Sequence, residues 1–323
     1  MYEIRIKPKN EYSKEEFSEL RERKNPNDVF FGEKKRPGSF LKKTISLLAV
    51  IVLSTFLSTV VMHATGDAPF SETLLGFAFG GKGEKSISRC PEGMVYVSRA
   101  GGSFCIDVYT ASAGKNCPNL EPSSRSETGE NLSASGCIPV SKPEVMPWRN
   151  ISQTQAQEAC QKAGKFLPGS EQWFYAARGT PVEGPWDEDN CNLNNNWLTD
   201  PGLTGSAKKC ISYAGAYDMV GNVWEWIDET VREGEVVGLK FPDPGYITSV
   251  DATGLVLDTD PDHPDPNYTK DRFWINPEGT RGVMRGGFHG SGTDGGVYST
   301  HAEMTPDFAG RAVGFRCATE PLR

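Results

Sequence analysis

The polar side chains that could do chemistry are concentrated near the end of the chain. The glycine-rich stretch 288–295 carries His289, Ser291 and Asp294, and His301 follows shortly afterwards. Closeness in a glycine-rich loop does not give a serine nucleophile an oriented base, so these residues do not predict a Ser-His-Asp triad. The two histidines could bind a metal ion in principle, but we interpret both as surface residues.

Cysteine is the other reactive residue type, and its distribution predicts disulfides. All eight cysteines lie in the part of the chain that follows residue 62. An even number confined to one part of the chain is typical of a disulfide framework, and no C-x-x-C or clustered His/Cys spacing indicates zinc. The cysteines are Cys90, Cys105, Cys117, Cys137, Cys160, Cys191, Cys210 and Cys317.

The first two cysteines border a predicted β-hairpin. Residues 94–97 and 104–109 are rich in β-branched and aromatic side chains, and residues 99–102 between them have the composition of a turn. Cys90 and Cys105 would then lie on paired strands, within reach of a disulfide bond.

Two helices are predicted in the middle of the chain. Ser152 and Gln155 have the spacing of a capping box, and alanines at helical spacing follow until Gly164 ends the helix. A second helix is expected from residue 170 to residue 178, with Trp173 on its inner face.

Two long stretches, 185–215 and 233–279, contain few periodic segments. Loops of this length are unusual in a compact domain unless something holds them. Disulfides and bound cations are the economical candidates, so we expect a loop-rich domain with internal cross-links.

The N-terminal part of the chain differs in charge and hydropathy. A net charge of −8 over 323 residues argues against nucleic acid as a partner, because phosphate binding needs a basic face. Residues 1–43 nevertheless carry twelve Lys/Arg and eight Asp/Glu, a net charge of +4. Residues 44–62 contain no charge, and at a rise of ~1.5 Å per residue they would span about 28 Å, close to a bilayer core. A buried helix and a cleaved signal peptide are the alternatives, and the long leader argues against the second.

These features predict a single-pass protein of the cell membrane with four regions. Residues 1–43 form a cytoplasmic arm, because positive charge beside a membrane segment stays inside. Residues 44–62 form a transmembrane helix and residues 63–89 form a stalk. Residues 90–323 form the extracellular folded domain.

Seven motifs occur in order along the folded domain. The motifs are Cys90–Val95, Phe104–Asp107, Cys160–Pro168, Gln172–Trp173, Ala216–Trp226, Arg285–Gly287 and Gly314–Cys317. Together they resemble the formylglycine-generating enzyme, or sulfatase-modifying factor, family across roughly residues 90–320, and the block Gly221–Trp226 is highly specific. The resemblance implies an α+β fold of the C-type-lectin kind with few regular elements and much loop.

The resemblance also implies a pattern of cross-links. In the family, the cysteine of the first helix pairs with that of the last motif, which here are Cys160 and Cys317. A second family bridge is missing, because Ala177 and Ala302 stand at its two positions. Phe166 stands where the family usually has arginine, so a supporting ion pair is expected to be absent. The expected pairs are Cys160–Cys317, Cys90–Cys105, Cys117–Cys137 and Cys191–Cys210.

Calcium is the structural ion that the resemblance implies. Hard cations take several oxygen ligands from side chains and exposed carbonyls. The candidate ligands are Asn222, the Val223 carbonyl and Glu225 at one site, and Asn192, the Leu193 carbonyl and Asp200 at the other. For the first of these sites, the alternative interpretation is a hydrogen-bonded turn ahead of two buried tryptophans.

The sequence argues against catalysis of the family's oxidative kind. Enzymes of the family bind copper through two cysteines in the C-terminal segment, but no cysteine lies between Arg285 and Cys317. Nothing else in the segment supplies an equivalent pair of soft ligands. We therefore expect no copper and no enzyme. A divergent enzyme with a different site in the same cleft, and a regulatory subunit of a membrane complex, are the alternatives.

The segment that follows Arg285 resembles the variable region of proteins diversified by retroelements, in which a lectin-type scaffold presents changing side chains. This resemblance implies a surface-displayed protein that binds a protein or another cell-surface ligand. Strand alternation along residues 297–303 would expose Ser299, His301 and Glu303 together. A solvated loop without a ligand is the alternative. The candidate ligand-binding residues are Phe288, His289, Gly290, Ser291, Asp294, Ser299, His301, Glu303 and Met304.

Overall fold

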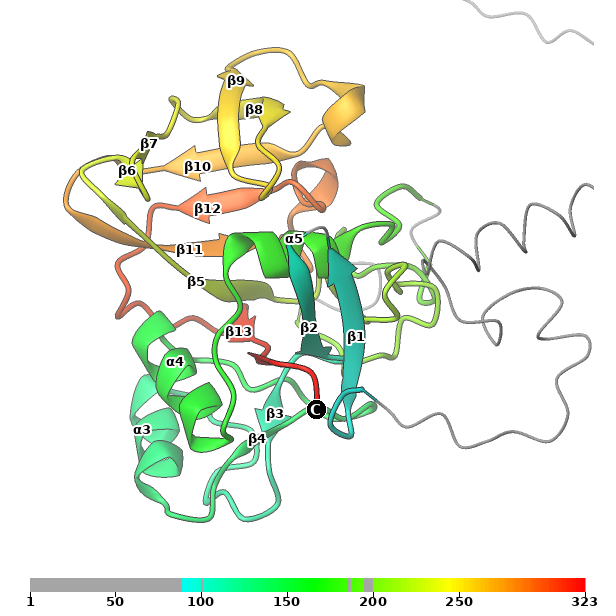
Figure 1. Cartoon of the computed structure of the whole chain (residues 1–323), viewed down its shortest axis with the longest axis vertical. Coiled ribbons are helices and arrows are strands. Elements are labelled where there is room, and N and C mark those ends of the chain that lie inside the picture. Colours follow the sequence, from blue (N-terminus) through cyan, green and yellow to red (C-terminus); the bar gives the residue numbers. More distant parts are fainter. Residues whose placement is uncertain (1–88, 100, 185–186, 195–199, 323) are drawn as a thin grey trace, which may run out of the picture. The chain divides into compact units, whose positions relative to one another are not determined.

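The computed structural model describes residues 89–99, 101–184, 187–194 and 200–322 (Figure 1). The predicted cytoplasmic arm and transmembrane helix, and nearly all of the predicted stalk, lie outside these ranges. Within them, none of the helices has the length and apolar character needed to cross a bilayer.

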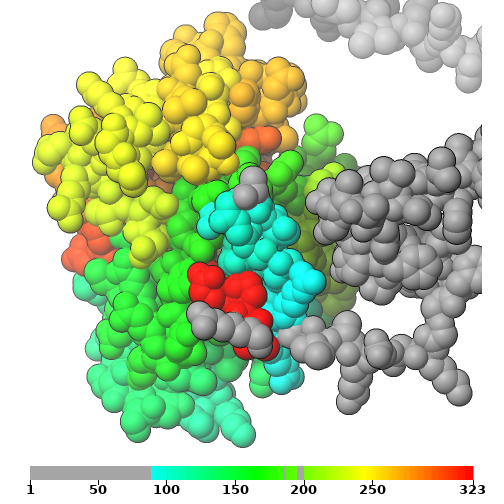
Figure 2. All heavy atoms as spheres, in the orientation of Figure 1, coloured from blue at the N-terminus to red at the C-terminus, as the bar shows by residue number. Residues whose placement is uncertain are grey.

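The predicted hairpin is present at the start of the described region. Strands β1 (Met94–Arg99) and β2 (Gly102–Asp107) pair antiparallel from end to end. The last strand, β14 (Ala318–Thr319), pairs with β2, so the red C-terminal residues lie against the cyan hairpin in Figure 2. The two ends of the domain are therefore joined in one small sheet.

The second sheet contains nine strands among the described residues and dominates the fold (Figure 1). Its main path runs in the order β7-β6-β5-β11-β12-β10-β8-β9, and β13 pairs parallel with β5 beside that path. A two-residue ladder of β3 (Ser112–Ala113) and β4 (Pro139–Val140) completes the β-structure. The strands of the large sheet are β5 (Trp224–Arg232), β6 (Glu235–Val236), β7 (Leu239–Lys240), β8 (Gly245–Val250), β9 (Val256–Asp260), β10 (Arg272–Ile275), β11 (Thr280–Arg285), β12 (Thr300–Ala302) and β13 (Val313–Phe315).

Both predicted helices form close to their expected limits. Helix α4 (Gln153–Lys162) begins with a capping box in which Ser152 and Gln155 exchange hydrogen bonds of 3.1 and 3.2 Å. Gly164, at φ +69°, follows its end. Helix α5 (Ser170–Ala177) packs on β5 and buries Trp173. A third helix, α3 (Arg125–Ser133), contacts α4, and short 3-10 turns occur at Pro266–Tyr268 and Gly292–Asp294.

The large sheet separates two hydrophobic cores, and strand alternation assigns each side chain to one of them. Along β5, Trp224 and Trp226 belong to the core that includes α4, and we call this side of the sheet the α4 face. Ile227 belongs to the core that includes α5, and we call that side the α5 face. Glu225 also points to the α5 face, where the indole nitrogen of Trp173 donates a 2.8 Å hydrogen bond to it.

The α5 face buries a charged pair at its centre. Glu225 and Arg316 are 1% and 0% exposed, and their side chains meet through two hydrogen bonds of 2.7 and 2.8 Å. Trp173 and Thr110 donate the remaining bonds to the same carboxylate. A buried ion pair is tolerated only when its hydrogen bonds are satisfied in this way, so the pair fixes helix, sheet and C-terminal strand in one arrangement.

All four expected disulfides are present. Cys160–Cys317 ties α4 to the C-terminal strand across 157 residues of chain. Ala177 and Ala302, at the positions of the missing family bridge, are both fully buried. Phe166 carries no charge, and the ion pair at this place is formed by its neighbour, since the Lys165 ammonium lies 2.6 Å from the buried Asp107 carboxylate. The other pairs are Cys90–Cys105, Cys117–Cys137 and Cys191–Cys210.

The fold is therefore the loop-rich α+β domain that the sequence predicts. The long stretches 185–215 and 233–279 differ in character. The first contains no helix or strand among its described residues, whereas the second contains β6 to β10.

Candidate ligand-binding site

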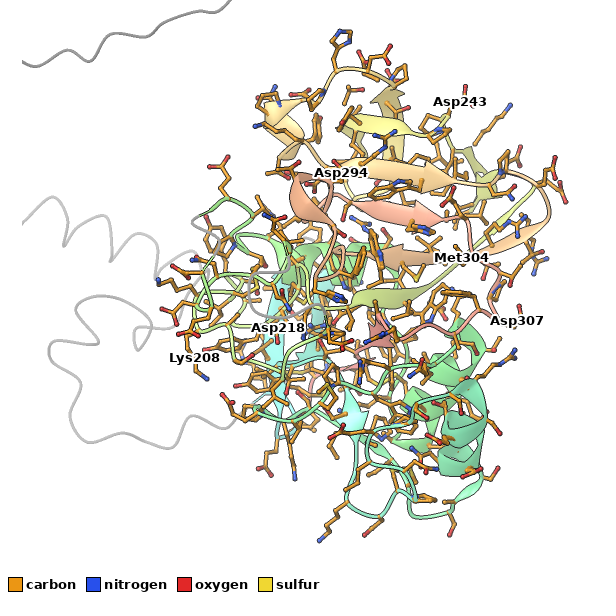
Figure 3. The ribbon with its side chains drawn as sticks, turned by 180° about the vertical axis from the view of Figure 1, so that it is seen from behind. Lys208, Asp218, Asp243, Asp294, Met304 and Asp307 are labelled. Atoms are coloured by element: carbon orange, nitrogen blue, oxygen red, sulfur yellow. A yellow bond between two sulfur atoms is a disulfide. The ribbon has the colours of Figure 1, made fainter. Side chains whose placement is uncertain are left out.

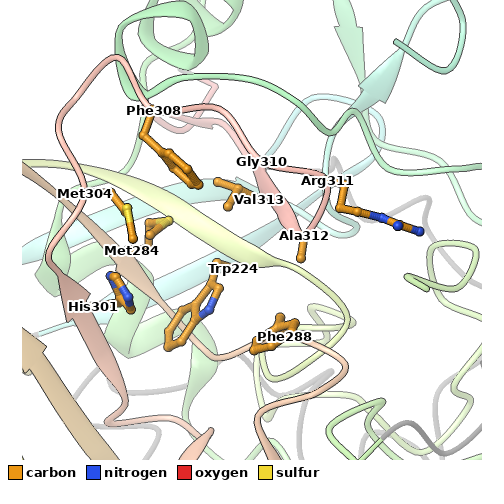
Figure 4. A pocket seen from close by; sticks show the side chains of 10 residues that line it. All are labelled: Trp224, Met284, Phe288, His301, Met304, Phe308, Gly310, Arg311, Ala312 and Val313. Atoms are coloured by element: carbon orange, nitrogen blue, oxygen red, sulfur yellow. The ribbon is translucent and has the colours of Figure 1, made fainter. Parts of the chain in front are cut away.

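The α4 face carries an apolar pocket of ≈ 300 Å³ (Figure 4). It forms where β5, β11 and β12 meet the connection that leads into β13. Its polar surface is small, so the pocket suits an apolar group rather than an ion. The aromatic and thioether side chains that line it are Trp224, Met284, Phe288, His301, Met304 and Phe308.

Aromatic packing holds the floor of the pocket in place. The Trp224 ring meets Trp274 edge to face at 5.7 Å and meets His301 at 5.5 Å. These contacts follow from the register, because Trp274 pairs with His301 between β10 and β12. Rigid aromatic side chains lose little conformational entropy on contact with a ligand, which favours binding.

His301 is an uncharged group in this pocket. Its burial lowers the pKa of the imidazole to about 4, so the ring is neutral near pH 7. The Nε2 atom lies 3.2 Å from a carboxylate oxygen of Glu303, at the edge of the pocket. The Nδ1 atom accepts from the Glu303 amide at 3.5 Å, so both ring nitrogens already have a partner and His301 presents an uncharged ring to the pocket.

One side of the pocket rim is charged. Arg311 lines the pocket and pairs with Asp200, and their side chains are 67% and 44% exposed. The guanidinium of Arg149 donates to the Arg311 carbonyl at 3.5 Å. Exposed ion pairs of this kind contribute little stability, so the rim can rearrange around a ligand.

The predicted ligand-binding residues divide into three groups: those that line the pocket, those that are exposed outside it, and those that are buried. Phe288, His301 and Met304 line the pocket together. Figure 3 labels Met304 and also Asp294, which does not line it. The remaining partly or fully exposed residues are Gly290, Ser291, Asp294 and Glu303.

Two of the predicted contact residues are buried instead. Ser299 is 0% exposed, and its hydroxyl donates to the Gly296 carbonyl and accepts from the Gly296 amide. The exposed strand face expected from alternation is therefore wrong at this residue, because a turn precedes β12. The Asp271 carboxylate accepts from the amides of Tyr298 and Ser299 and holds that turn in place.

His289 is also buried, at 6% exposure, so its interpretation as a surface residue is wrong. Its backbone amide and its Nδ1 atom lie 3.1 and 3.2 Å from the Asn222 carbonyl. Ser291 accepts from the Phe288 amide at 2.9 Å, and the Gly292 amide donates to the Leu193 carbonyl. These contacts hold the loop against Asn222, in the block Gly221–Trp226, and against Leu193, while Phe288 faces the pocket.

Gly286 explains why the loop can turn away from β11. Its φ is +90°, and a Cβ placed there would lie 2.5 Å from the Met219 carbonyl oxygen. Another residue would need both a strained backbone and a shift of its neighbour. The Arg-Gly-Gly motif is thus a requirement of the backbone at this point.

Sequence reasoning missed most of the pocket lining. Phe308 and Arg311 line the pocket from a segment that carries no recognisable motif, and Trp274 packs on Trp224, which lines it. Met284 could have been found, because it lies one residue before the Arg-Gly-Gly motif and must face away from buried Arg285.

A comparison with known protein families shows which family the chain belongs to. Residues 102–321 match the sulfatase-modifying factor enzyme 1-like domain. The chain belongs to this family.

Two curated relatives of this family are both named Inactive C-alpha-formylglycine-generating enzyme 2. The protein of Bos taurus is 34% identical over 96 residues, which is 25% of this chain and 32% of the relative. The protein of Mus musculus is 25% identical over 194 residues, which is 55% of this chain and 50% of the relative. The chain thus spans half or less of the length of these relatives.

Solved structures are similar at low identity. The Major Tropism Determinant M1 variant has a TM-score of 0.40 at 14% identity, covering 73% of this chain and 54% of that one. PvdO from Pseudomonas aeruginosa has a TM-score of 0.36 at 17% identity, covering 74% and 89%. Treponema denticola variable protein 1 has a TM-score of 0.35 at 15% identity, covering 72% and 100%. Similarity at this level says nothing about what the present chain binds.

The first calcium site expected for a member of this family is crowded by protein donors. Both oxygens of Glu225 accept hydrogen bonds, two of them from Arg316. Asn222 accepts from the Gly202 amide through its side chain at 2.7 Å, and Val223 is 2% exposed. An ion held by Glu225 would have to displace Arg316, so calcium at this site stays a prediction.

The second calcium site fits an ion in part. The side-chain oxygen and nitrogen of Asn192 are buried and have no hydrogen-bond partner, and such an oxygen suits a hard cation. The Leu193 carbonyl accepts from Gly292, and Asp200 pairs with Arg311. In the part of the chain that the structure describes, no three His, Cys, Asp or Glu side chains gather to hold a metal ion.

No cysteine of the folded domain is free to bind a soft metal ion as a thiolate. All eight cysteines are paired in the four disulfides. His289 is turned to the Asn222 carbonyl, whereas His301 packs on Trp224 and Trp274. The two imidazoles thus have separate surroundings and separate partners.

Proposed function

We propose that this chain is a membrane-anchored, surface-displayed ligand-binding protein whose recognition site is the apolar pocket of the α4 face. The observation that supports it is the meeting of Phe288, His301 and Met304, three residues of the C-terminal segment, in that one pocket. Aromatic and thioether side chains around an apolar pocket have the composition of a binding hot spot.

The ligand is a protein or another cell-surface molecule that inserts an apolar group. The pocket volume of ≈ 300 Å³ is of the size that encloses one large side chain. Neutral His301 adds an uncharged aromatic surface, and the pair of Arg311 and Asp200 borders the rim. Apolar burial supplies affinity and the few polar groups supply orientation.

The scaffold suits this role because it is rigid beneath a changeable surface. Disulfides and the buried pair of Glu225 and Arg316 hold the sheet, while Phe288 and Met304 project from connections between strands. Retroelement diversification of the exposed residues in segment 288–304 is part of the proposal. A nearby near-copy of the 3′ end of the gene, differing chiefly at adenines, is the expected genomic signature.

Methyl NMR on the full-length chain tests the pocket directly. The probe is N-acetyl-tryptophanamide, and the signals are the labelled methionine methyl groups. Met284 and Met304 line the pocket, whereas Met94 lies in another cluster and serves as the internal reference. We expect the first two signals to shift with added probe and the Met94 signal to stay. Equal behaviour of all three signals would contradict the proposed site.

A filled pocket provides the matched control. Ala312 lines the pocket and is partly exposed, so Ala312→Trp places a ring in the cavity without entering the core. The probe-induced shifts should then disappear at unchanged unfolding temperature. Retained shifts in this variant would show that the probe binds elsewhere.

Two further measurements test the remaining parts. An epitope at the C-terminus should be accessible to antibody on intact cells, and an N-terminal epitope only after permeabilisation. Incubation of the full-length chain with a sulfatase-derived cysteine peptide and Cu(I) should leave the peptide unchanged. Turnover of the peptide would replace the binding function with catalysis.

A further inference from the structure

The α5 side of the domain carries a second hollowed surface, separate from the apolar pocket. Three adjoining depressions of ≈ 270, ≈ 260 and ≈ 350 Å³ follow one another there. The first two share Arg178 and Tyr213, and the last two share Val182 and Thr269. The shared residues make one continuous groove, and none of the residues lining the apolar pocket lines it.

Tyrosine dominates the first two depressions of this groove. Tyr96 and Tyr175 line the first, Tyr298 lines the second, and Tyr213 stands between them. The Phe174 ring packs 5.7 Å from Tyr298 and supports it from below. Tyrosine supplies a large contact area with only two rotatable bonds, so its immobilisation on binding costs little.

Tyr213 is exposed yet held in place. Its side chain is 89% exposed, the second-highest value among the large hydrophobic residues that the structure describes as exposed. Its ring lies on Gly179, where a Cβ would come within 2.4 Å of ring atoms, and its amide donates to the Arg178 carbonyl at 2.9 Å. Glycine at φ +78° leaves room for the ring at this point. An aromatic ring positioned by the backbone but left in water is available to a partner.

Arg178 is the charged residue of the first two depressions. It is exposed, its guanidinium lies 5.6 Å from the centre of the Tyr175 ring, and no carboxylate within the described ranges forms an ion pair with it. A cation without a carboxylate partner, flanked by aromatic rings, fits an anionic group by charge complementarity.

We propose that this groove binds an extended acidic segment of a partner polypeptide. A carboxylate of the segment pairs with Arg178, and apolar or aromatic side chains on either side enter the depressions beside Tyr96 and Tyr298. The third depression, which Lys270 and Glu183 line, takes the continuation of the segment. Tyrosine and arginine are the residue types that dominate binding energy at protein interfaces, which favours a polypeptide as the occupant.

The inference does not depend on the proposed function, because the two surfaces lie on opposite sides of β5 and share no residue. A partner can occupy the groove while the pocket is empty or filled. Variants of one surface therefore serve as controls for the other.

Selection from a library of random 12-residue peptides on the immobilised full-length chain tests the groove. We expect the recovered peptides to be enriched in Asp or Glu next to aromatic or proline residues. Affinity of a recovered peptide should fall at least about tenfold in Arg178→Glu and in Tyr213→Ala. It should recover in part in Arg178→Lys, which keeps the charge, and stay unchanged in Ala312→Trp, which fills the other pocket.

Both positions are exposed, so these variants should fold, and unchanged unfolding curves confirm it. Three outcomes overturn the inference. The first is a selection that yields no peptide above the background of Arg178→Glu. The second is a set of peptides whose affinity does not change in the Arg178 and Tyr213 variants. The third is binding of anionic glycans on an array without binding of peptides, which would assign the groove to another class of ligand.

Discussion

The two faces of strand β5 differ in how their side chains are held. On the α5 face, Glu225 sits in a closed set of hydrogen bonds with Arg316, Trp173 and Thr110 and has no free acceptor. On the α4 face, the preceding residue, Trp224, borders an open apolar pocket. One peptide bond thus separates a position that the fold requires from one that a ligand can use.

The difference teaches where change is tolerated in this domain. Polar groups buried with complete hydrogen bonding are costly to alter, because removal of one partner leaves the other unsatisfied. Partly exposed apolar side chains such as Phe288 and Met304 lack such partners, so their replacement leaves nothing unpaired. The comparison therefore predicts large stability effects for the covalent and charged framework and small ones for the pocket.

The largest effect is expected from the disulfide that ties α4 to the C-terminal strand. The double variant Cys160→Ala/Cys317→Ala should lose about 5 kcal/mol of unfolding free energy, because its cross-link closes the longest loop. Denaturant unfolding of the full-length chain measures the loss. The control Cys191→Ala/Cys210→Ala opens a loop of 19 residues and should lose about 3 kcal/mol. Equal losses would show that loop length does not govern the contribution.

Loss of the buried ion pair should come next. Glu225→Gln keeps the shape of the side chain but leaves Arg316 as an uncompensated buried charge, which costs about 3–5 kcal/mol. Thermal and denaturant unfolding measure it. Asp307→Asn removes the exposed partner of Arg125 and should cost less than about 1 kcal/mol. A loss at Glu225 as small as the one at Asp307 would contradict the contrast between the two faces.

The pH dependence of stability tests two more buried carboxyl groups. Burial raises the pKa of Asp218 and of Asp271 to about 7, well above the value of about 3.9 in an unfolded chain. The folded state then binds more protons, so both groups stabilise the fold at low pH. That contribution is lost as the pH rises from about 4 through about 7. Unfolding free energy should therefore fall over this range, and fall less steeply in Asp271→Asn.

Asp271 is the sharper of the two cases, since it holds the turn before β12 through the amides of Tyr298 and Ser299. The buried Arg285 works in the opposite direction and lowers the pKa of Asp271. Parallel slopes for the wild type and Asp271→Asn would show that this carboxyl group does not titrate between pH 4 and 7.

The smallest effect is expected in the pocket itself. Met304→Ala removes a partly exposed side chain and should change the unfolding free energy by less than about 1 kcal/mol. Met284 lines the same pocket but is 1% exposed, so Met284→Ala should cost about 2–5 kcal/mol. Urea unfolding of the pair gives both values. A larger loss at Met304 than at Met284 would show that the pocket wall supports the fold rather than a ligand.

Much of the framework could be predicted because its signals are local. The capping box at Ser152, the hairpin 94–107 and the order of family motifs need only a few neighbouring residues each. The disulfide Cys160–Cys317 came from family resemblance, since no local rule joins residues 157 apart.

The candidate site was harder because it depends on tertiary contacts. Ser299 looks like an exposed strand residue by alternation, but Asp271, 28 residues away, bends the backbone ahead of β12. His289 looks like a surface histidine, but the Asn222 carbonyl lies beside it. Phe308 reaches the pocket from a connection without periodicity. In each case the deciding partner is distant in sequence and carries no signal at the residue itself.

The Cys160–Cys317 bond also has a mechanical consequence. If the domain were pulled by its N-terminal and C-terminal ends, tension would pass along the chain to Cys160, across the two sulfur atoms and out through Cys317. Residues 161–316 would bear none of it. That shielded interval contains every strand of the large sheet, all residues that line the apolar pocket and most of those that line the groove on the α5 side. A pull on the two ends of the domain would therefore leave this interval in shape until a covalent bond broke.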